Sequence, residues 1–230
     1  MIQVISSLWK GLQLLKTPAL RPFVLIPLLI NFVLYGVALV LGYFYLNHLI
    51  VQMIPDTLHW LTWLIYPLFF ISFCMIGFFT FSMLANLIAA PFYAKLAAKT
   101  LDVMGFSLLS AVEASAMQIW KAELNRLRYS LTHTLPLLIL FVIPVVNLIA
   151  PIIWLLFSAW CVALEYFGYP LENRGMLFPE QKQKLKTMRV DAVIFGSIVL
   201  VGQTLPIINI FISPTAVIAA TLQVSNKIES

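Results

Sequence analysis

The chain has 230 residues, of which 62% are hydrophobic and only 10% are charged, and its formal net charge is +5. This composition is too apolar and too poor in charge for an ordinary water-soluble domain. It indicates an integral membrane protein embedded in a lipid bilayer. Basic residues are expected beside membrane spans, so the positive charge predicts no nucleic-acid partner. Cys74 and Cys161 both lie in apolar runs and predict neither a disulfide framework nor a metal site.

The first segment, residues 2–16, has the pattern of an amphipathic helix. Lys10 and Lys16 lie off its apolar face. That face carries large side chains at helical spacing: Ile5, Leu8, Trp9, Leu12 and Leu15. We expect this helix to lie in the membrane interface and to pack against lipid or against the other helices.

A short polar turn, which reads TPALRPF at 17–23, separates this helix from a long apolar run. Thr17 is typical of a helix N-cap, and Pro18 suits the first helical position. The start of a helix offers free N–H groups and a positive dipole end, and Arg21 adds a planar fork of donors that suits an oxyanion. Two interpretations stay open: a binding site for a small anion, or a helix cap followed by a basic anchor at the membrane surface.

Two long runs, 22–55 and 57–94, contain no Asp, Glu, Lys or Arg and are separated by Asp56. As helices both would be longer than about 50 Å, whereas a hydrocarbon core is about 30 Å thick. We therefore predict two full spans that form an antiparallel hairpin and that tilt or bend, with Pro27 and Pro67 as candidate kinks.

Two later apolar runs are each interrupted by the same pattern, which reads IPVVNLIAP at 143–151 and LPIINIFISP at 205–214. Two prolines around an asparagine favour a turn over a continuous helix. The helical arms before the two turns would be only about 22 Å long, which is less than the thickness of the hydrocarbon core. We predict re-entrant helical hairpins that penetrate the membrane halfway, over 129–168 and 192–224. Kinked spans, or caps on a structural helix bundle, are the alternatives.

The placement of basic residues supports this topology. If both hairpins are re-entrant, all 14 Lys and Arg residues lie on one face of the membrane, as the positive-inside rule favours. Backbone that bends inside a membrane must be buried in protein or line a wet cavity. Asn147 and Asn209 lie within the two turns and are candidates for a pore lining, although hydrogen bonding between helices is the default role of such residues.

The segment 95–128 is predicted to be helical and cytoplasmic. Glu123 lies in the middle of its apolar face and Arg126 follows three residues later, so the two can pair. The pair is either a structural ion pair at the membrane surface or a charged constriction at the mouth of a pore. The second polar segment, 169–191, is predicted to be a solvated basic loop and helix near anionic headgroups.

Signatures of enzymes are missing from the sequence. The three histidines lack metal-binding spacing, and the chain contains no familiar catalytic or phosphate-binding motif. The apolar runs also lack carboxylates that could relay protons. We predict that the protein is not an enzyme and uses no cofactor or metal, and that anions move passively, as through a channel.

Four stretches together resemble the CysZ-type sulfate permeases of bacterial inner membranes. They read LRPFVLIPLLIN at 20–31, ANLIAAPFYAKLA at 85–97, FSAWCVALEYFGYPLEN at 157–173 and LPIINIFISPTAV at 205–217. The resemblance implies a multi-pass helical fold with two full spans and half-penetrating hairpins, which agrees with a single membrane domain over 1–230. It also implies a homo-oligomer, and family members are described with protomers packed antiparallel across the membrane. The basic asymmetry of this chain favours one orientation instead.

The resemblance further implies uptake of sulfate, or of a related oxyanion, for assimilation into cysteine. The family's anion motif, Gly-Leu/Ile-Arg before the first span, falls on Ala19, Leu20 and Arg21, which are the candidate sulfate-binding residues. Ala19 replaces the glycine, and Pro22 replaces a second arginine that often follows. The alternative function is a non-transporting membrane scaffold, or a regulatory partner of another transporter.

Overall fold

A computed structural model describes residues 2–53, 60–105 and 116–226. In these ranges the regular structure is helical, which confirms the predicted all-α class. The helices are α1 (Ile2–Leu14), α2 (Pro22–Met53), α3 (Thr62–Val103), α4 (Ala116–Leu140), the short 3₁₀ helix η2 (Val146–Leu148), α5 (Ala150–Glu172), α6 (Phe178–Thr187), α7 (Arg189–Gln203) and α8 (Pro206–Asn226). They form two compact units: the first is Phe23–Phe92, and the second is Met1–Pro22 together with Tyr93–Ser230.

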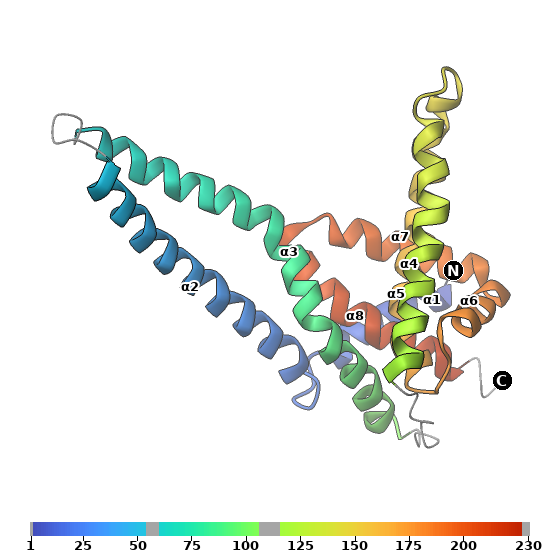
Figure 1. Ribbon diagram of the computed structural model, residues 1–230. Helices are drawn as coiled ribbons and strands as arrows, with labels where there is room; N and C mark the ends of the chain where they lie inside the picture. The colour runs from blue at the N-terminus through green and yellow to red at the C-terminus, as the bar shows by residue number, and fades with distance from the viewer. Residues whose placement is uncertain (1, 54–59, 106–115, 227–230) are drawn as a thin grey trace. The chain divides into compact units, whose positions relative to one another are not determined.

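The unit Phe23–Phe92 consists of most of α2 and α3, which run antiparallel (Figure 1). Two hydrogen bonds fix this direction. The hydroxyl groups of Tyr35 and Thr80 lie 2.6 Å apart, and the Tyr66 hydroxyl donates to Asn47 Oδ1 at 2.8 Å. The two long helices therefore run antiparallel, whereas their crossing of the membrane as two full spans stays a prediction. The connecting loop around Asp56 lies outside the described residues.

The outer surface of these two helices is strongly apolar. Phe32 is 73% exposed and Trp63 is 68% exposed, although both are large hydrophobic side chains. Among the described residues, three helical stretches are long and apolar enough to cross a membrane, namely Pro22–Ile50, Ala150–Glu172 and Ile208–Asn226, and Thr62–Gly77 is a shorter apolar stretch. Exposed aromatic and aliphatic side chains on such helices are expected where lipid is the solvent. The predicted membrane class is therefore supported.

The core of the other unit is built from α5, α7 and α8. The α5 and α7 backbones touch at Gly196, where a β-carbon would lie 1.8 Å from the Ala159 carbonyl oxygen. Next to this contact the rings of Phe167 and Phe195 pack edge to face, with centroids 4.9 Å apart. Close backbone approach through small residues is a common way for helices to pack in membranes.

Helix α1 packs along α8 with only part of its apolar face. Leu8 and Leu15 are buried, whereas Ile5 and Trp9 are 52% and 62% exposed. The exposed side chains line an apolar groove of about 270 Å³ together with residues of α7 and α8. Helix α1 therefore covers Ile2–Leu14 of the segment predicted over 2–16 and contacts other helices on one side, whereas its place in the membrane interface stays a prediction.

The first predicted turn separates α4 from α5. The two helices lie side by side as a hairpin (Figure 1), with the ring of Phe141 6.0 Å from that of Trp154 near the turn and Trp160 Nε1 donating to the Tyr129 hydroxyl at 3.1 Å. The turn occupies 141–149 and contains η2, so the interruption predicted at 143–151 is confirmed. Within it, Val145 has a φ of 71°, which is rare for a β-branched residue.

The second predicted turn is placed wrongly. The break between α7 and α8 occupies only Thr204 and Leu205, and α8 begins at Pro206. A proline at the first position of a helix loses nothing, because the N–H group there has no partner inside the helix. Pro214 lies within α8, so its neighbourhood remains helical rather than bent into a turn.

Candidate functional site

The segment between α1 and α2 is a turn closed by its own hydrogen bonds. The backbone N–H and the side-chain hydroxyl of Thr17 both donate to the Leu14 carbonyl oxygen, at 2.9 and 2.7 Å. Thr17 therefore caps the end of α1, whose last carbonyl groups have no partner within the helix. The prediction that Thr17 and Pro18 open the next helix is wrong, since α2 begins at Pro22.

The three predicted sulfate-binding residues differ in their surroundings. Ala19 and Arg21 are exposed, whereas Leu20 is completely buried. The N–H groups of Leu20 and Arg21 both donate to the Thr17 carbonyl oxygen, at 3.1 and 3.3 Å. Because these N–H groups are used within the turn, they are not available to an anion, and the Arg21 side chain is the group that can bind one. Leu20 anchors the turn because its side chain is buried.

The Arg21 side chain is oriented by the turn itself. Its Nε donates to the Lys16 carbonyl oxygen at 2.9 Å. In the part of the chain that the structure describes, the two terminal amino groups of Arg21 have no hydrogen-bond or ion-pair partner. A guanidinium held in this way can present two parallel N–H bonds to an oxyanion.

The turn is attached to a buried helix through α1. A β-carbon at Gly11 would lie 2.8 Å from the Thr215 carbonyl oxygen, so α1 and α8 approach closely at this point. One turn earlier, Gln223 Nε2 donates to Ser7 Oγ at 2.8 Å, and both side chains are buried. These contacts give the turn a rigid support, which an anion site needs if it is to keep its geometry.

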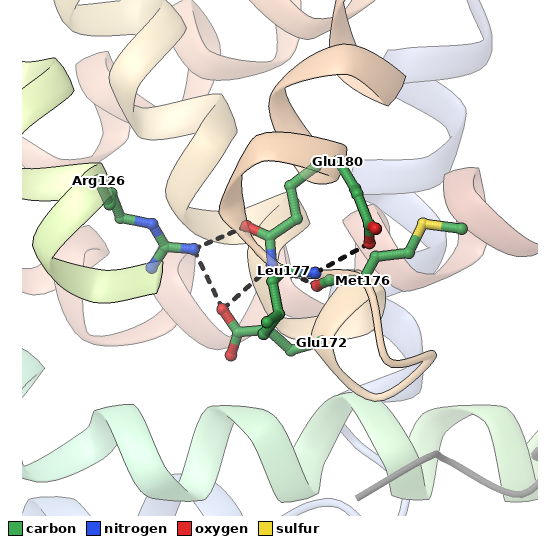
Figure 2. A network of polar contacts seen from close by, with 6 residues as sticks. Arg126, Glu172, Met176, Leu177 and Glu180 are labelled. Carbon is green, nitrogen blue, oxygen red and sulfur yellow. Dashed lines mark hydrogen bonds and ion pairs between the residues drawn. The ribbon is translucent and has the colours of Figure 1, made fainter. Parts of the chain in front are cut away.

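A second charged site joins α4, α5 and α6, as Figure 2 shows. Arg126 Nη2 donates to Glu172 Oε1 at 3.1 Å and to Gln181 Oε1 at 2.9 Å. Gln181 Nε2 donates in turn to the same Glu172 oxygen at 3.2 Å and to the Met176 carbonyl oxygen at 2.9 Å. We call Arg126, Glu172 and Gln181 the arginine network.

Space for the arginine network comes from a glycine. A β-carbon at Gly168 would lie 2.6 Å from Arg126 Nη2, so a larger residue would displace the guanidinium. The guanidinium also lies over the ring of Phe178, 5.7 Å from its centroid. A charge–aromatic contact of this kind adds to the hydrogen bonds that hold the arginine in place.

The partners of Arg126 were not foreseen. The sequence predicts Glu123 as the partner, but the side chain of Glu123 lies outside the part that the structure describes. Gln181 is only 1% exposed, so this portion of the segment predicted to be solvated is in fact buried. Its polar residues alone gave no signal of this, because they are typical of a loop.

The predicted pore-lining asparagines lie on other elements than the arginine network. Asn147 lies in η2, at the turn of the α4–α5 hairpin, and is exposed. The part of α4 between Arg126 and this turn is about 20 Å long, so the two residues are far apart. Asn209 lies in the first turns of α8, where it is half-buried and its N–H donates to the Leu205 carbonyl oxygen at 2.8 Å.

A buried polar cluster that the sequence did not predict links α5, α7 and α8. The Tyr166 hydroxyl donates to Ser213 Oγ at 2.9 Å and accepts from Gln203 Nε2 at 2.7 Å. Tyr166 and Ser213 are each 1% exposed. Single polar residues within apolar helices gave no sign that these three side chains meet.

The fold and its surface define the class: an all-helical membrane protein with an exposed, oriented arginine beside its first long apolar helix. The chain belongs to the family described as "Sulfate transporter CysZ/Etoposide-induced protein 2.4", which matches residues 7–214. The resemblance noted from the sequence is thereby confirmed.

Several curated relatives named "Sulfate transporter CysZ" are similar over nearly the whole chain. The relative from Pseudomonas fluorescens is 38% identical over 222 residues, which cover 93% of this chain and 89% of the relative. The one from Pectobacterium atrosepticum is 37% identical, with 92% and 80% covered, and the one from Salmonella typhimurium is 35% identical, with 92% and 87% covered. These relatives are named as transporters, and not as enzymes.

Proposed function

We propose that this protein is a permease that moves sulfate, or a closely related oxyanion, across the bacterial inner membrane for assimilation into cysteine. Family membership and the names of the relatives support the substrate class. The observation that carries the assignment to a site is the Arg21 side chain, which is exposed and oriented by the Lys16 carbonyl oxygen at 2.9 Å. This side chain can bind the anion before the anion enters the membrane.

In this proposal the three residues of the turn have different roles. Arg21 donates two N–H bonds to two oxygens of sulfate, which is the geometry that a guanidinium forms best. Leu20 is completely buried and holds the turn in place. Ala19 is exposed and small, so it leaves room for the anion to approach.

Helix lengths support re-entrant hairpins. Helix α7 has 15 residues and begins at the exposed Arg189. Such a helix is about 22 Å long, which is too short to carry the α7–α8 connection across a hydrocarbon core of about 30 Å. The apolar part of α4, after Arg128, is about 18 Å long and is followed directly by the turn to α5. Both hairpins would therefore enter and leave on the basic side.

The turn of the α4–α5 hairpin supports a homo-oligomer. Three of its aliphatic side chains, Val142, Val145 and Leu148, are 81%, 78% and 77% exposed. Exposing such an apolar surface to water is unfavourable, and lipid cannot form hydrogen bonds with the irregular backbone beneath it. A second copy of the chain would satisfy both, with Asn147 then facing the interior of the assembly. Parallel and antiparallel protomers are both compatible with this contact.

The permeation path would pass the arginine network. Arg126 is held by two acceptors from other helices, so its guanidinium is fixed in place, and the Glu172 carboxylate offsets its charge. Charged groups fixed at a pore mouth can set ion selectivity. Glu123, on the same helix, would tune that charge. The amide of Asn209 would line the path deeper in the membrane.

The test is uptake of radiolabelled sulfate into proteoliposomes that contain only this protein. We expect uptake above empty liposomes, and we expect Arg21→Ala to reduce it at least tenfold at low sulfate, because one charge-assisted bidentate contact is lost. Arg189→Ala, which removes another exposed arginine, is the matched control and should transport normally.

Two results would count against the proposal. Absence of uptake by folded protein would favour a scaffold or a regulatory partner. Normal uptake by Arg21→Ala would leave the permease function supported and would show that Arg21 is not part of the anion site.

A further inference from the structure

The turn after α1 brings a second basic residue next to Arg21. Lys16 and Arg21 are five positions apart, yet Arg21 Nε donates to the Lys16 carbonyl oxygen at 2.9 Å. Both side chains are exposed. The contact arises because Thr17 turns the chain back on itself, with its carbonyl oxygen accepting from the N–H groups of Leu20 and Arg21.

The turn and the helices α1, α2 and α8 contain no carboxylate. The sequence contains no Asp or Glu before Asp56, and α8, on which α1 packs, also contains none. Among the residues that the structure describes, neither Lys16 nor Arg21 forms an ion pair. An anion held by Arg21 would therefore meet no carboxylate from these segments, and it would attract the Lys16 ammonium on its flexible stem.

The next residue in the chain cannot contribute. Pro22 has neither a charge nor an N–H group. A tetrahedral dianion that meets Arg21 alone keeps one of its two negative charges unpaired, and the turn's own N–H groups at Leu20 and Arg21 already have an acceptor. Lys16 is the other basic residue of this turn and is the candidate for a second cation.

We propose that Lys16 is the second cation of the oxyanion site, so that a dianion binds between the Lys16 ammonium and the Arg21 guanidinium. This inference rests on the proposed function of Arg21. The two groups play different parts: the guanidinium fixes the orientation of two oxygens, and the ammonium, on its flexible four-carbon stem, supplies a point charge to a third. The site thereby prefers a doubly charged oxyanion over a singly charged one.

A purely structural role for Lys16 makes a different prediction. A lysine near the end of α1 also interacts favourably with the negative end of the helix dipole. That role would change the stability of the protein and would leave its preference among anions untouched. The test therefore measures affinity and charge preference together with thermal unfolding.

The experiment uses the full-length protein in proteoliposomes and compares Lys16→Gln, Lys16→Arg, Arg21→Ala and Lys10→Gln. Lys16→Gln should raise the sulfate concentration for half-maximal uptake about tenfold, as expected for the loss of one charge-assisted contact. Lys16→Arg should stay within about threefold of the unchanged protein. Lys10→Gln removes an exposed lysine from the middle of α1 and is the matched control, with no change expected.

Competition by methyl sulfate, a monoanion of similar shape, provides the second measurement. Lys16→Gln should weaken the binding of sulfate much more than the binding of methyl sulfate, so the preference for the dianion should fall. If Lys16→Gln behaves like Lys10→Gln while Arg21→Ala is impaired, the role of Lys16 is refuted and the Arg21 site stands. If Arg21→Ala is also unchanged, the proposed site itself fails. A lower melting temperature with unchanged anion preference would likewise refute the binding role.

Discussion

Replacing Gly196 with alanine should force apart two helices whose backbones are in contact. Gly196 lies in α7 and faces Ala159 of α5, and both residues are buried. The added β-carbon would lie 1.8 Å from the Ala159 carbonyl oxygen and 2.7 Å from its carbonyl carbon. Ordinary contact begins near 3.4 Å, so the helices would have to separate by more than an ångström. The obstacle is backbone, which cannot turn aside as a side chain can.

This geometry gives an order of magnitude for the free energy of unfolding that Gly196→Ala would lose. Overpacking a core typically costs about 1–3 kcal/mol, and we expect about 3 kcal/mol or more at Gly196 because the neighbouring Phe167–Phe195 contact would also be disturbed. For a chain of this size, a loss of about 3 kcal/mol corresponds to a melting temperature lower by about 6–12 °C. The separation would also loosen the Tyr166–Ser213 contact between α5 and α8.

The assay is thermal unfolding of the full-length protein in one detergent, followed by circular dichroism. The control is Gly36→Ala in α2, since a β-carbon at Gly36 has no atom within 4 Å. Alanine favours a helix over glycine by about 1 kcal/mol, so this variant should melt at the same temperature or slightly higher. If Gly196→Ala melts within about 2 °C of Gly36→Ala, the inferred contact between α5 and α7 is wrong.

Two further predictions concern the α4–α5 hairpin. In a double-mutant cycle, Arg126→Met and Glu172→Gln should show a coupling of about 1 kcal/mol in unfolding free energy, a modest value because both side chains are partly exposed. Additive effects would mean that the ion pair contributes nothing. Val145→Gly should raise the unfolding free energy by about 1 kcal/mol, since valine at a φ of 71° is strained and glycine is not. Val142→Gly is the control at the same turn, and an equal loss of stability in both variants would contradict the strain argument.

Features that depend on local chemistry could be predicted from the sequence. The long runs without charge predicted the two long helices, because a bilayer selects segments by their apolar length. The interruption at 143–151 predicted the turn after α4, since Pro144 has no N–H group and disfavours a helical residue before it. Arg21 could be proposed as an anion-binding residue because its type, and its place just before an apolar run, are visible in the sequence.

Features that depend on which groups come within reach of one another were decided only by the tertiary structure. Thr17 could have capped either neighbouring helix, and it bonds to Leu14 because the turn brings the end of α1 to it. Gln181 has the composition of a surface residue, but α6 folds back and buries it against Arg126. Likewise Lys16 is close to Arg21 because the chain reverses between them. A hydrogen bond forms over about 3 Å whatever the separation along the chain. The sequence therefore shows which side chains can donate, and the tertiary structure determines which acceptors lie within reach.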